Sequence, residues 1–97
     1  MAKFLFSYRV PKDYPPGQPD AMDAWTAWFQ ELGSAVLEPG NPTFESSTVG
    51  NTAGDTRLGG YSVVEAEDLE SALTAAKSCP TVTRGGGVDV GLITEIM

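Results

Sequence analysis

Residues 58–76 read LGGYSVVEAEDLESALTAA, and they carry the clearest pattern in the chain. Tyr61 to Ala66 is rich in aromatic and branched residues, which predicts a strand, and the glycine pair before it permits a β-bulge or a close backbone approach. Asp68 then offers a carboxylate oxygen to the free amides of a helix start. A narrow apolar stripe follows at helical spacing, formed by Leu69, Ala72, Leu73 and Ala76. The segment therefore predicts a strand followed by a helix that packs closely on its neighbours.

The N-terminal part of the chain repeats the order of strand and helix. Lys3 to Val10 predicts a strand, and the four prolines of residues 11–19 predict a surface connection. A helix is expected from Asp20 onward, because four large apolar residues recur at helical spacing. These residues are Met22, Trp25, Phe29 and Leu32, with Trp28 beside them. Ser34 to Glu38 then predicts a short second strand.

The remaining segments complete an α+β pattern. Asn41 to Arg57 shows no periodicity and predicts a long loop, which in a compact domain is usually functional or disordered. Pro80 is expected to end the second helix, and Val88 to Ile96 alternates as a fourth strand does. The predicted strands carry apolar residues on both faces, whereas two helices cover only one face of a four-stranded sheet. We therefore expect a homodimer in which two sheets pack face to face about a twofold axis.

The composition limits the function mainly by exclusion. With 97 residues and a net charge of −7, the chain has room for one domain, residues 1–97. The acidic balance argues against a nucleic-acid partner, because proteins that bind nucleic acids carry a basic stripe. No run approaches the roughly 20 apolar residues of a membrane span, so no membrane partner is expected. Cys79 is the one cysteine and cannot form an internal disulfide, which favours a cytoplasmic protein.

The absence of histidine removes several classes of catalytic and metal site. Histidine is the usual acid/base group at neutral pH, the partner of serine and cysteine nucleophiles, and a ligand in most zinc sites. Gly85 to Gly87 precedes a predicted strand, whereas phosphate-binding loops lie between a strand and a helix. We therefore interpret these glycines as a flexible connection and not as a phosphate site. Cys79 has only Lys77 nearby to lower its pKa, so we interpret it as a small buried residue. We expect no metal and no cofactor.

Several segments together resemble the YCII-related proteins, also called the DGPF-domain family. The resemblance rests on five stretches: LGGYSVVEA (58–66), DLESAL (68–73), the Cys79-Pro80 pair, GGVDVG (86–91) and AWFQELGSAVLEPGNP (27–42). It implies a ferredoxin-like β-α-β-β-α-β fold with a four-stranded antiparallel sheet and two helices on one face. It also implies pairing as a dimeric α/β barrel, in agreement with the dimer expected from the strand faces.

The resemblance does not carry the family's proposed chemistry with it. Members proposed to be lyase-like enzymes have a histidine near the start of the first helix, and the corresponding place in this chain is near Met22. The Asp-Gly-Pro-Phe motif would fall on residues 48–51, which read TVGN. We therefore expect a small-molecule-binding or accessory module. Two alternatives stay open: a lyase or isomerase that uses carboxylates and tyrosine in the barrel cleft, and a purely structural or interaction protein.

Candidate ligand-binding residues are the polar and aromatic groups at the ends of the predicted strands and in the long loop. They are Tyr8, Arg9, Trp25, Asp55, Arg57, Tyr61, Glu65 and Glu95. Trp25 also suits plain core packing, and Asp55 with Arg57 also suits a solvated loop. Glu65 and Glu95 are both placed on predicted strands. A carboxylate that faces the interior of the sheet has a raised pKa and can act as a general acid or base in a chain that has no histidine. Tyr8 or Tyr61 would then donate a hydrogen bond to a developing oxyanion.

Overall fold

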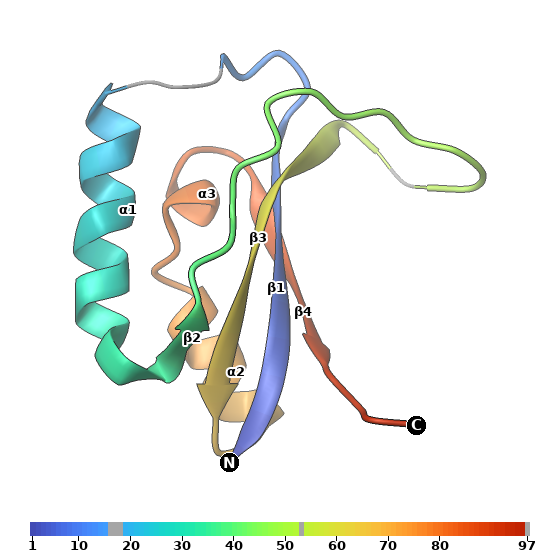
Figure 1. Cartoon of the computed structure of the whole chain (residues 1–97). Coiled ribbons are helices and arrows are strands. Elements are labelled where there is room, and N and C mark those ends of the chain that lie inside the picture. The colour runs from blue at the N-terminus through green and yellow to red at the C-terminus, as the bar shows by residue number, and fades with distance from the viewer. Residues whose placement is uncertain (16–18, 53, 97) are drawn as a thin grey trace.

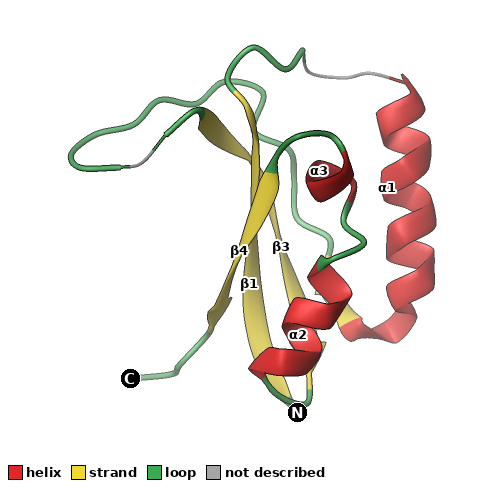
Figure 2. Cartoon of the chain, turned by 180° about the vertical axis from the view of Figure 1, so that it is seen from behind, coloured by secondary structure: helices red, strands yellow, loops and turns green. Residues whose placement is uncertain are grey.

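The computed structural model describes residues 1–15, 19–52 and 54–96. Its elements, in chain order, are β1 (Ala2–Pro11), α1 (Pro19–Leu32), the 3₁₀ turn η1 (Gly33–Ala35), β2 (Val36–Glu38), β3 (Thr56–Ala66), α2 (Leu69–Ala76), α3 (Pro80–Thr83) and β4 (Gly87–Leu92). The strands form one four-stranded antiparallel sheet in the order β2-β3-β1-β4. Both longer helices lie on the same side of it (Figures 1 and 2). This α+β, ferredoxin-like architecture confirms the predicted fold class.

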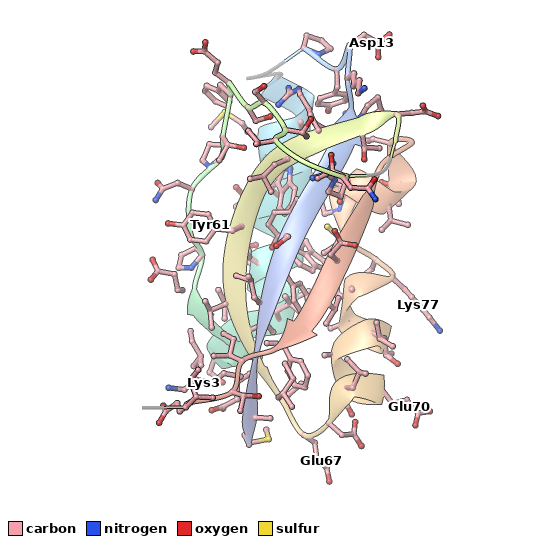
Figure 3. The ribbon with its side chains drawn as sticks, turned by 90° about the vertical axis from the view of Figure 1, so that its right-hand side faces the viewer. Lys3, Asp13, Tyr61, Glu67, Glu70 and Lys77 are labelled. Carbon is pink, nitrogen blue, oxygen red and sulfur yellow. The ribbon has the colours of Figure 1, made fainter. Side chains whose placement is uncertain are left out.

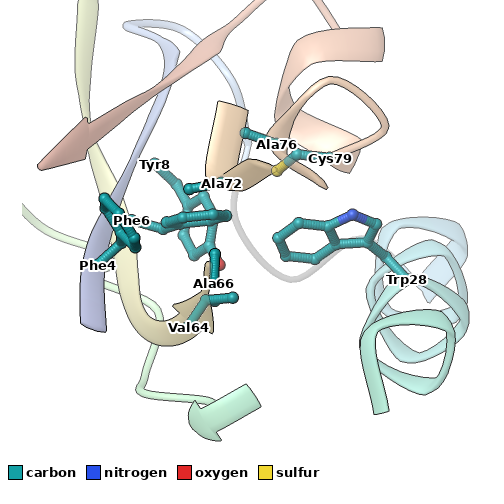
Figure 4. Close-up of a cluster of buried hydrophobic side chains, with 9 residues drawn as sticks. All are labelled: Phe4, Phe6, Tyr8, Trp28, Val64, Ala66, Ala72, Ala76 and Cys79. Atoms are coloured by element: carbon teal, nitrogen blue, oxygen red, sulfur yellow. The ribbon is translucent and has the colours of Figure 1, made fainter. Parts of the chain in front are cut away.

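The core lies between the sheet and the helices and follows from the alternation of β1. Phe4, Phe6 and Tyr8 point to the helical side and are almost fully buried. They meet Trp28 of α1 and the small residues of α2, so that a cluster of nine buried side chains fills the layer (Figure 4). The indole nitrogen of Trp28 donates to the carbonyl of Ala75 at 3.3 Å, which ties α1 to the end of α2.

Two details of the glycine pair and the second helix agree with the sequence. Tyr8 pairs with Gly60 and Arg9 with Leu58, so Gly59 is the extra residue of a β-bulge. Asp68 caps α2, since its carboxylate accepts from the amide of Ser71 at 2.8 Å. Both features were predicted from local residue types, because each one depends on neighbours within a few positions in the chain.

Several boundaries differ from the prediction. β3 begins at Thr56, so Arg57 belongs to a strand and not to the long loop. The strand expected over Ser34 to Glu38 is shorter, because η1 occupies its first residues. β4 ends at Leu92, so Glu95 lies outside any strand and is exposed, which contradicts its predicted place. The prediction that Pro80 ends the second helix is wrong, because α2 already ends at Ala76 and Pro80 is the first residue of the separate helix α3.

The buried apolar face of α1 is centred on a different residue from the one that the sequence predicts. Trp28 is its most buried aromatic residue at 2% exposure, whereas Met22 is 65% exposed. Asp20 lies within the first turn of α1, which begins at Pro19. In α2, Ala72 is buried and Leu73 remains half exposed, because the close approach of the helix is made through its small residues.

The opposite side of the sheet has no helix over it within the described residues (Figure 3). Leu5 and Val63 pair directly across β1 and β3 at its centre, and Tyr61 lies beside them at 38% exposure. Lys3 and Glu65 form the neighbouring pair of opposite charge. This surface, which we call the open face, therefore mixes apolar residues with complementary charges.

Candidate functional site

A cavity of about 340 Å³ lies on the helical side of the sheet, where β1 ends and β3 begins. Its walls are α1, the sheet, the chain after β1 and the segment after β2. The last of these, residues 39–44, runs along β3 toward the cavity (Figure 1), and we call it the strap. The described lining residues are Tyr8, Val10, Pro11, Tyr14, Ala21, Met22, Trp25, Thr26, Phe29, Pro39, Gly40, Asn41, Pro42, Thr43, Phe44, Arg57, Gly59, Gly60, Tyr61, Thr81 and Arg84.

The strap is fixed to β3 by backbone contacts that replace a regular strand. The amide of Thr43 donates to the carbonyl of Gly59 at 3.1 Å, and the Thr43 hydroxyl donates to the carbonyl of Leu58 at 2.7 Å. Gly40 has a φ of +72°, and a Cβ there would overlap the carbonyl oxygen of Tyr61. Only glycine fits this approach without strain, so the strap is held tightly over the sheet.

Aromatic side chains form the wall of the cavity on the side of α1. Trp25 is half-buried and packs edge-on against Tyr8, with ring centroids 4.5 Å apart and an interplanar angle of 70°. Phe29 continues the wall at 5.7 Å from Trp25. Edge-on and tilted packing of this kind fixes the rings and leaves apolar surface toward the cavity. The wall therefore suits a planar or apolar ligand body.

A chain of buried hydroxyl groups connects the core to the strap. The Tyr8 hydroxyl donates to Ser62 Oγ at 2.7 Å, and Ser62 Oγ donates to the carbonyl of Pro39 at 2.6 Å. Burial raises the pKa of Tyr8 well above its ordinary value, because it disfavours the phenolate. Tyr8 consequently stays protonated and acts as a hydrogen-bond donor, not as a base.

Two arginines from distant parts of the chain line the cavity, and both contact Tyr14. Arg57 Nη2 donates to the Tyr14 carbonyl at 3.0 Å and Arg57 Nη1 donates to the Thr43 carbonyl at 3.2 Å. Arg84 Nη1 lies 3.4 Å from the Tyr14 hydroxyl oxygen. Arg57 thus joins the strap to the segment after β1 and brings a positive charge to the cavity.

The structure brings together half of the residues proposed from the sequence. Tyr8, Trp25, Arg57 and Tyr61 all line the cavity. Tyr61 contributes from the edge, where its hydroxyl lies 3.5 Å from the side-chain nitrogen of Asn41.

The other four do not line it. Arg9 is bound to Thr56, with Nε donating to its hydroxyl at 3.2 Å, and Asp55 is exposed. Glu65 pairs with Lys3 near the start of β1 and lies on the open face, whereas Tyr8 lies near the end of β1 on the helical side, so the structure does not bring these two candidate residues together. Glu95 is exposed beyond β4.

Several lining residues were not singled out from the sequence. Tyr14, Arg84 and the strap come from segments with no periodicity, which gave no sign of where they would lie. The turn residues Pro39, Gly40, Asn41 and Pro42 were the available signal, because such a cluster marks a stretch that leaves the sheet.

Cys79 lies in the core and not in the cavity. It is fully buried, its sulfur lies 3.1 Å from the Thr81 hydroxyl, and burial raises its pKa. Among the described residues, no group of three or more Cys, Asp or Glu side chains is arranged to hold a metal ion. Across the same residues, no helix is long and apolar enough to cross a membrane.

The fold has a counterpart among solved structures. The chain superposes on 5-chloro-2-hydroxyhydroquinone dehydrochlorinase (TftG) from Burkholderia phenoliruptrix AC1100, solved in complex with 2,5-dihydroxybenzoquinone, with a TM-score of 0.65. The two share 17% sequence identity over 96% of this chain and 92% of that one. No protein-family model and no curated protein matches the chain. The likeness shows that the two chains share a fold.

Proposed function

We propose that this chain is a YCII-like protein whose cavity binds a small organic molecule, and that it serves as a binding or accessory module. The observation that carries the proposal is the cavity itself, a concave space of about 340 Å³ with an aromatic wall and a few fixed polar groups. Ligand sites are typically of this size and composition. Tyr8, Trp25, Arg57 and Tyr61 are the residues that we assign to ligand contact.

The solved neighbour supports a planar ligand. TftG is complexed with 2,5-dihydroxybenzoquinone, a planar ring with polar substituents. The wall formed by Trp25 and Phe29 offers apolar surface to such a ring, and the buried Tyr8 lines the same cavity. The aromatic residues of this chain and the ligand of the neighbour with the same fold both support the proposal of a planar ligand.

The alternative of a lyase or isomerase is supported less well. The enzymatic alternative uses a carboxylate near the reacting group as its acid or base. The described lining of the cavity contains no Asp or Glu, and Glu65 lies away from it. Burial keeps Tyr8 protonated at neutral pH, so it does not replace the missing base. Because the neighbour TftG is named as a dehydrochlorinase, an enzymatic role is the second candidate function for this chain.

A variant that fills the mouth of the cavity tests the binding site. Thr26 is exposed and lines the cavity, whereas Gln30 is exposed on the same helix and does not line it. Thermal-shift screening against small cyclic metabolites is expected to give stabilising compounds, since a ligand at about 100 times its Kd stabilises by roughly 2.7 kcal/mol. Thr26→Trp should abolish these shifts and Gln30→Trp should leave them unchanged. Shifts that survive Thr26→Trp would place binding elsewhere, and the absence of any stabilising compound would count against a ligand-binding function.

We also propose a homodimer through the open faces, as the YCII resemblance implies, in a cytoplasmic setting. Leu5 and Val63 lie at the centre of the open face, and its paired charges Lys3 and Glu65 allow a self-complementary contact about a twofold axis. Sedimentation velocity at micromolar concentration should show a dimer. Leu5→Arg should give a folded monomer, whereas Leu73→Arg on exposed α2 should not. A monomeric native protein would refute the dimer.

A further inference from the structure

A second hollow adjoins the cavity and is lined by more polar residues. It is lined by Lys12, Ser46, Ser47, Thr48, Thr56 and Arg57. Four of these six residues carry hydroxyl groups and two carry a positive charge, and the described lining contains no carboxylate. Arg57 lines both spaces, so the aromatic cavity and the hydroxyl-lined hollow meet at this residue.

The charge at this junction is not matched by a carboxylate within the described residues. The hydrogen bonds of Arg57 go to neutral carbonyl oxygens, those of Thr43, Leu58 and Tyr14. Carbonyl oxygens orient a guanidinium group but leave its net charge in place. Lys12 adds a second positive charge in the lining of the hollow. In a chain with a net charge of −7, this concentration of cations makes one region attractive to anions.

We infer that the ligand is a planar organic anion, with its apolar body in the cavity and its carboxylate, sulfonate or phosphate group at Arg57, facing the hollow that contains Lys12. This inference rests on the proposed binding function and specifies the ligand's charge. The planar guanidinium suits two oxygens of one anionic group, and the Thr56 hydroxyl remains able to donate because its oxygen accepts from Arg9. The aromatic wall alone would not distinguish charged from neutral ligands.

A matched pair of probes tests the inference. Calorimetric titration of the full chain with 2-naphthoate and with 2-naphthamide compares two planar bodies that differ in charge. We expect the anion to bind at least about tenfold more tightly at low salt. Added salt should narrow this difference, because it screens the contact at the partly exposed Arg57.

Three variants locate the source of the preference. Arg57→Gln should abolish it, and Lys12→Gln, which removes an exposed side chain, should reduce it while binding of 2-naphthamide stays unchanged. Lys77→Gln removes the same charge at the end of α2, where the exposed side chain points away from the molecule (Figure 3) and lines neither space, and should leave the preference intact. Circular dichroism confirms folding, and if Arg57→Gln unfolds, Arg57→Lys with Lys12→Gln carries the test.

The outcomes separate the two proposals. Equal affinity for both probes would overturn the anion inference and leave the binding function standing. Failure of both probes to bind, together with an empty metabolite screen, would remove the binding function itself. A preference that persists in both the Arg57 and Lys12 variants, or that Lys77→Gln lowers equally, would show that general charge and not this junction selects the ligand, and would also overturn the inference.

Discussion

Replacing Ser62 should destabilise the protein more than replacing Tyr8, although the two hydroxyls share one hydrogen bond. Ser62 accepts from Tyr8 at 2.7 Å and donates to the Pro39 carbonyl at 2.6 Å. Ser62→Ala therefore leaves a buried phenol donor without its acceptor and a strap carbonyl without its donor. Tyr8→Phe removes the phenol donor but leaves Ser62 bound to Pro39.

The expected magnitudes follow from this asymmetry. Removing a hydrogen bond without stranding a partner costs about 0.5–1.5 kcal/mol, whereas a stranded buried polar group costs about 1–3 kcal/mol. Every buried side-chain nitrogen and oxygen of the described residues has a partner, so Ser62→Ala would create the exception. Tyr8→Phe should therefore cost about 1 kcal/mol and Ser62→Ala about 2 kcal/mol. The double variant should cost less than the sum, because it has no phenol hydroxyl left to strand.

Urea unfolding followed by circular dichroism at neutral pH measures the four free energies of this cycle. A loss of 1 kcal/mol corresponds to about 4–8 °C in Tm for a domain of this size. Ser34→Ala, at an exposed position of η1, controls for the general effect of replacing serine by alanine. A Tyr8→Phe loss as large as that of Ser62→Ala, or strict additivity in the double variant, would refute the buried hydroxyl chain.

The remaining predictions concern four other features. The free energy of unfolding should fall as the pH rises above about 10, because tyrosine in the unfolded chain ionises there while burial keeps the pKa of Tyr8 higher in the folded chain. Tyr8→Phe should lessen that fall, as urea titrations at graded pH would show. Gly40→Ala should lower Tm by more than Gly50→Ala, since both have positive φ but only Gly40 faces a backbone atom; equal losses in thermal melts would contradict this. Asp68→Ala should lower Tm, whereas Asp68→Ser, which keeps a capping oxygen, should not. Because the amide of Ser71 lowers the pKa of Asp68, the contribution of this cap to stability is present above the ordinary carboxyl pKa and is lost as the pH falls, which thermal melts at graded pH would show. Cys79 should react with a thiol reagent far more slowly in the native protein than in urea, because it is buried and its pKa is raised; similar rates would place it at the surface.

The sequence was informative where structure depends on near neighbours. The cap at Asp68 and the strand over Lys3 to Val10 were predicted from residue types within a few positions. The glycine pair likewise indicated a bulge or a close backbone approach, and a bulge is present at Gly59. The end of β4 was predicted wrongly. The alternation in the sequence continues to Ile96, whereas the last described pair between β1 and β4 is Phe4 with Leu92. Strand length depends on the partner strand, and in the register that pairs Phe4 with Leu92, β1, which begins at Ala2, has no residue opposite Glu95.

The site was predicted only in part for a related reason. Tyr8, Trp25, Arg57 and Tyr61 belong to regular elements, and these are the predicted residues that line the cavity. The strap has no periodicity, and its position depends on long-range contacts such as the one between Ser62 and Pro39, 23 residues apart. Glu65 was misplaced because the pairing register, which sets it across from Lys3, is not visible in the sequence.

The glycine pair connects the fold to the candidate site. β2 has only three residues, so the far half of β3 would lack a neighbour on that edge without the strap. Gly60 has a φ of +151°, and a Cβ there would lie 3.0 Å from the Asn41 carbonyl oxygen, so the strap approaches β3 where side chains are missing. The bulge at Gly59 falls at the same point and bends the strand there. Because the strap and the bulge together form one wall of the cavity, the residues that mark a strand start in the sequence also determine where a ligand would bind.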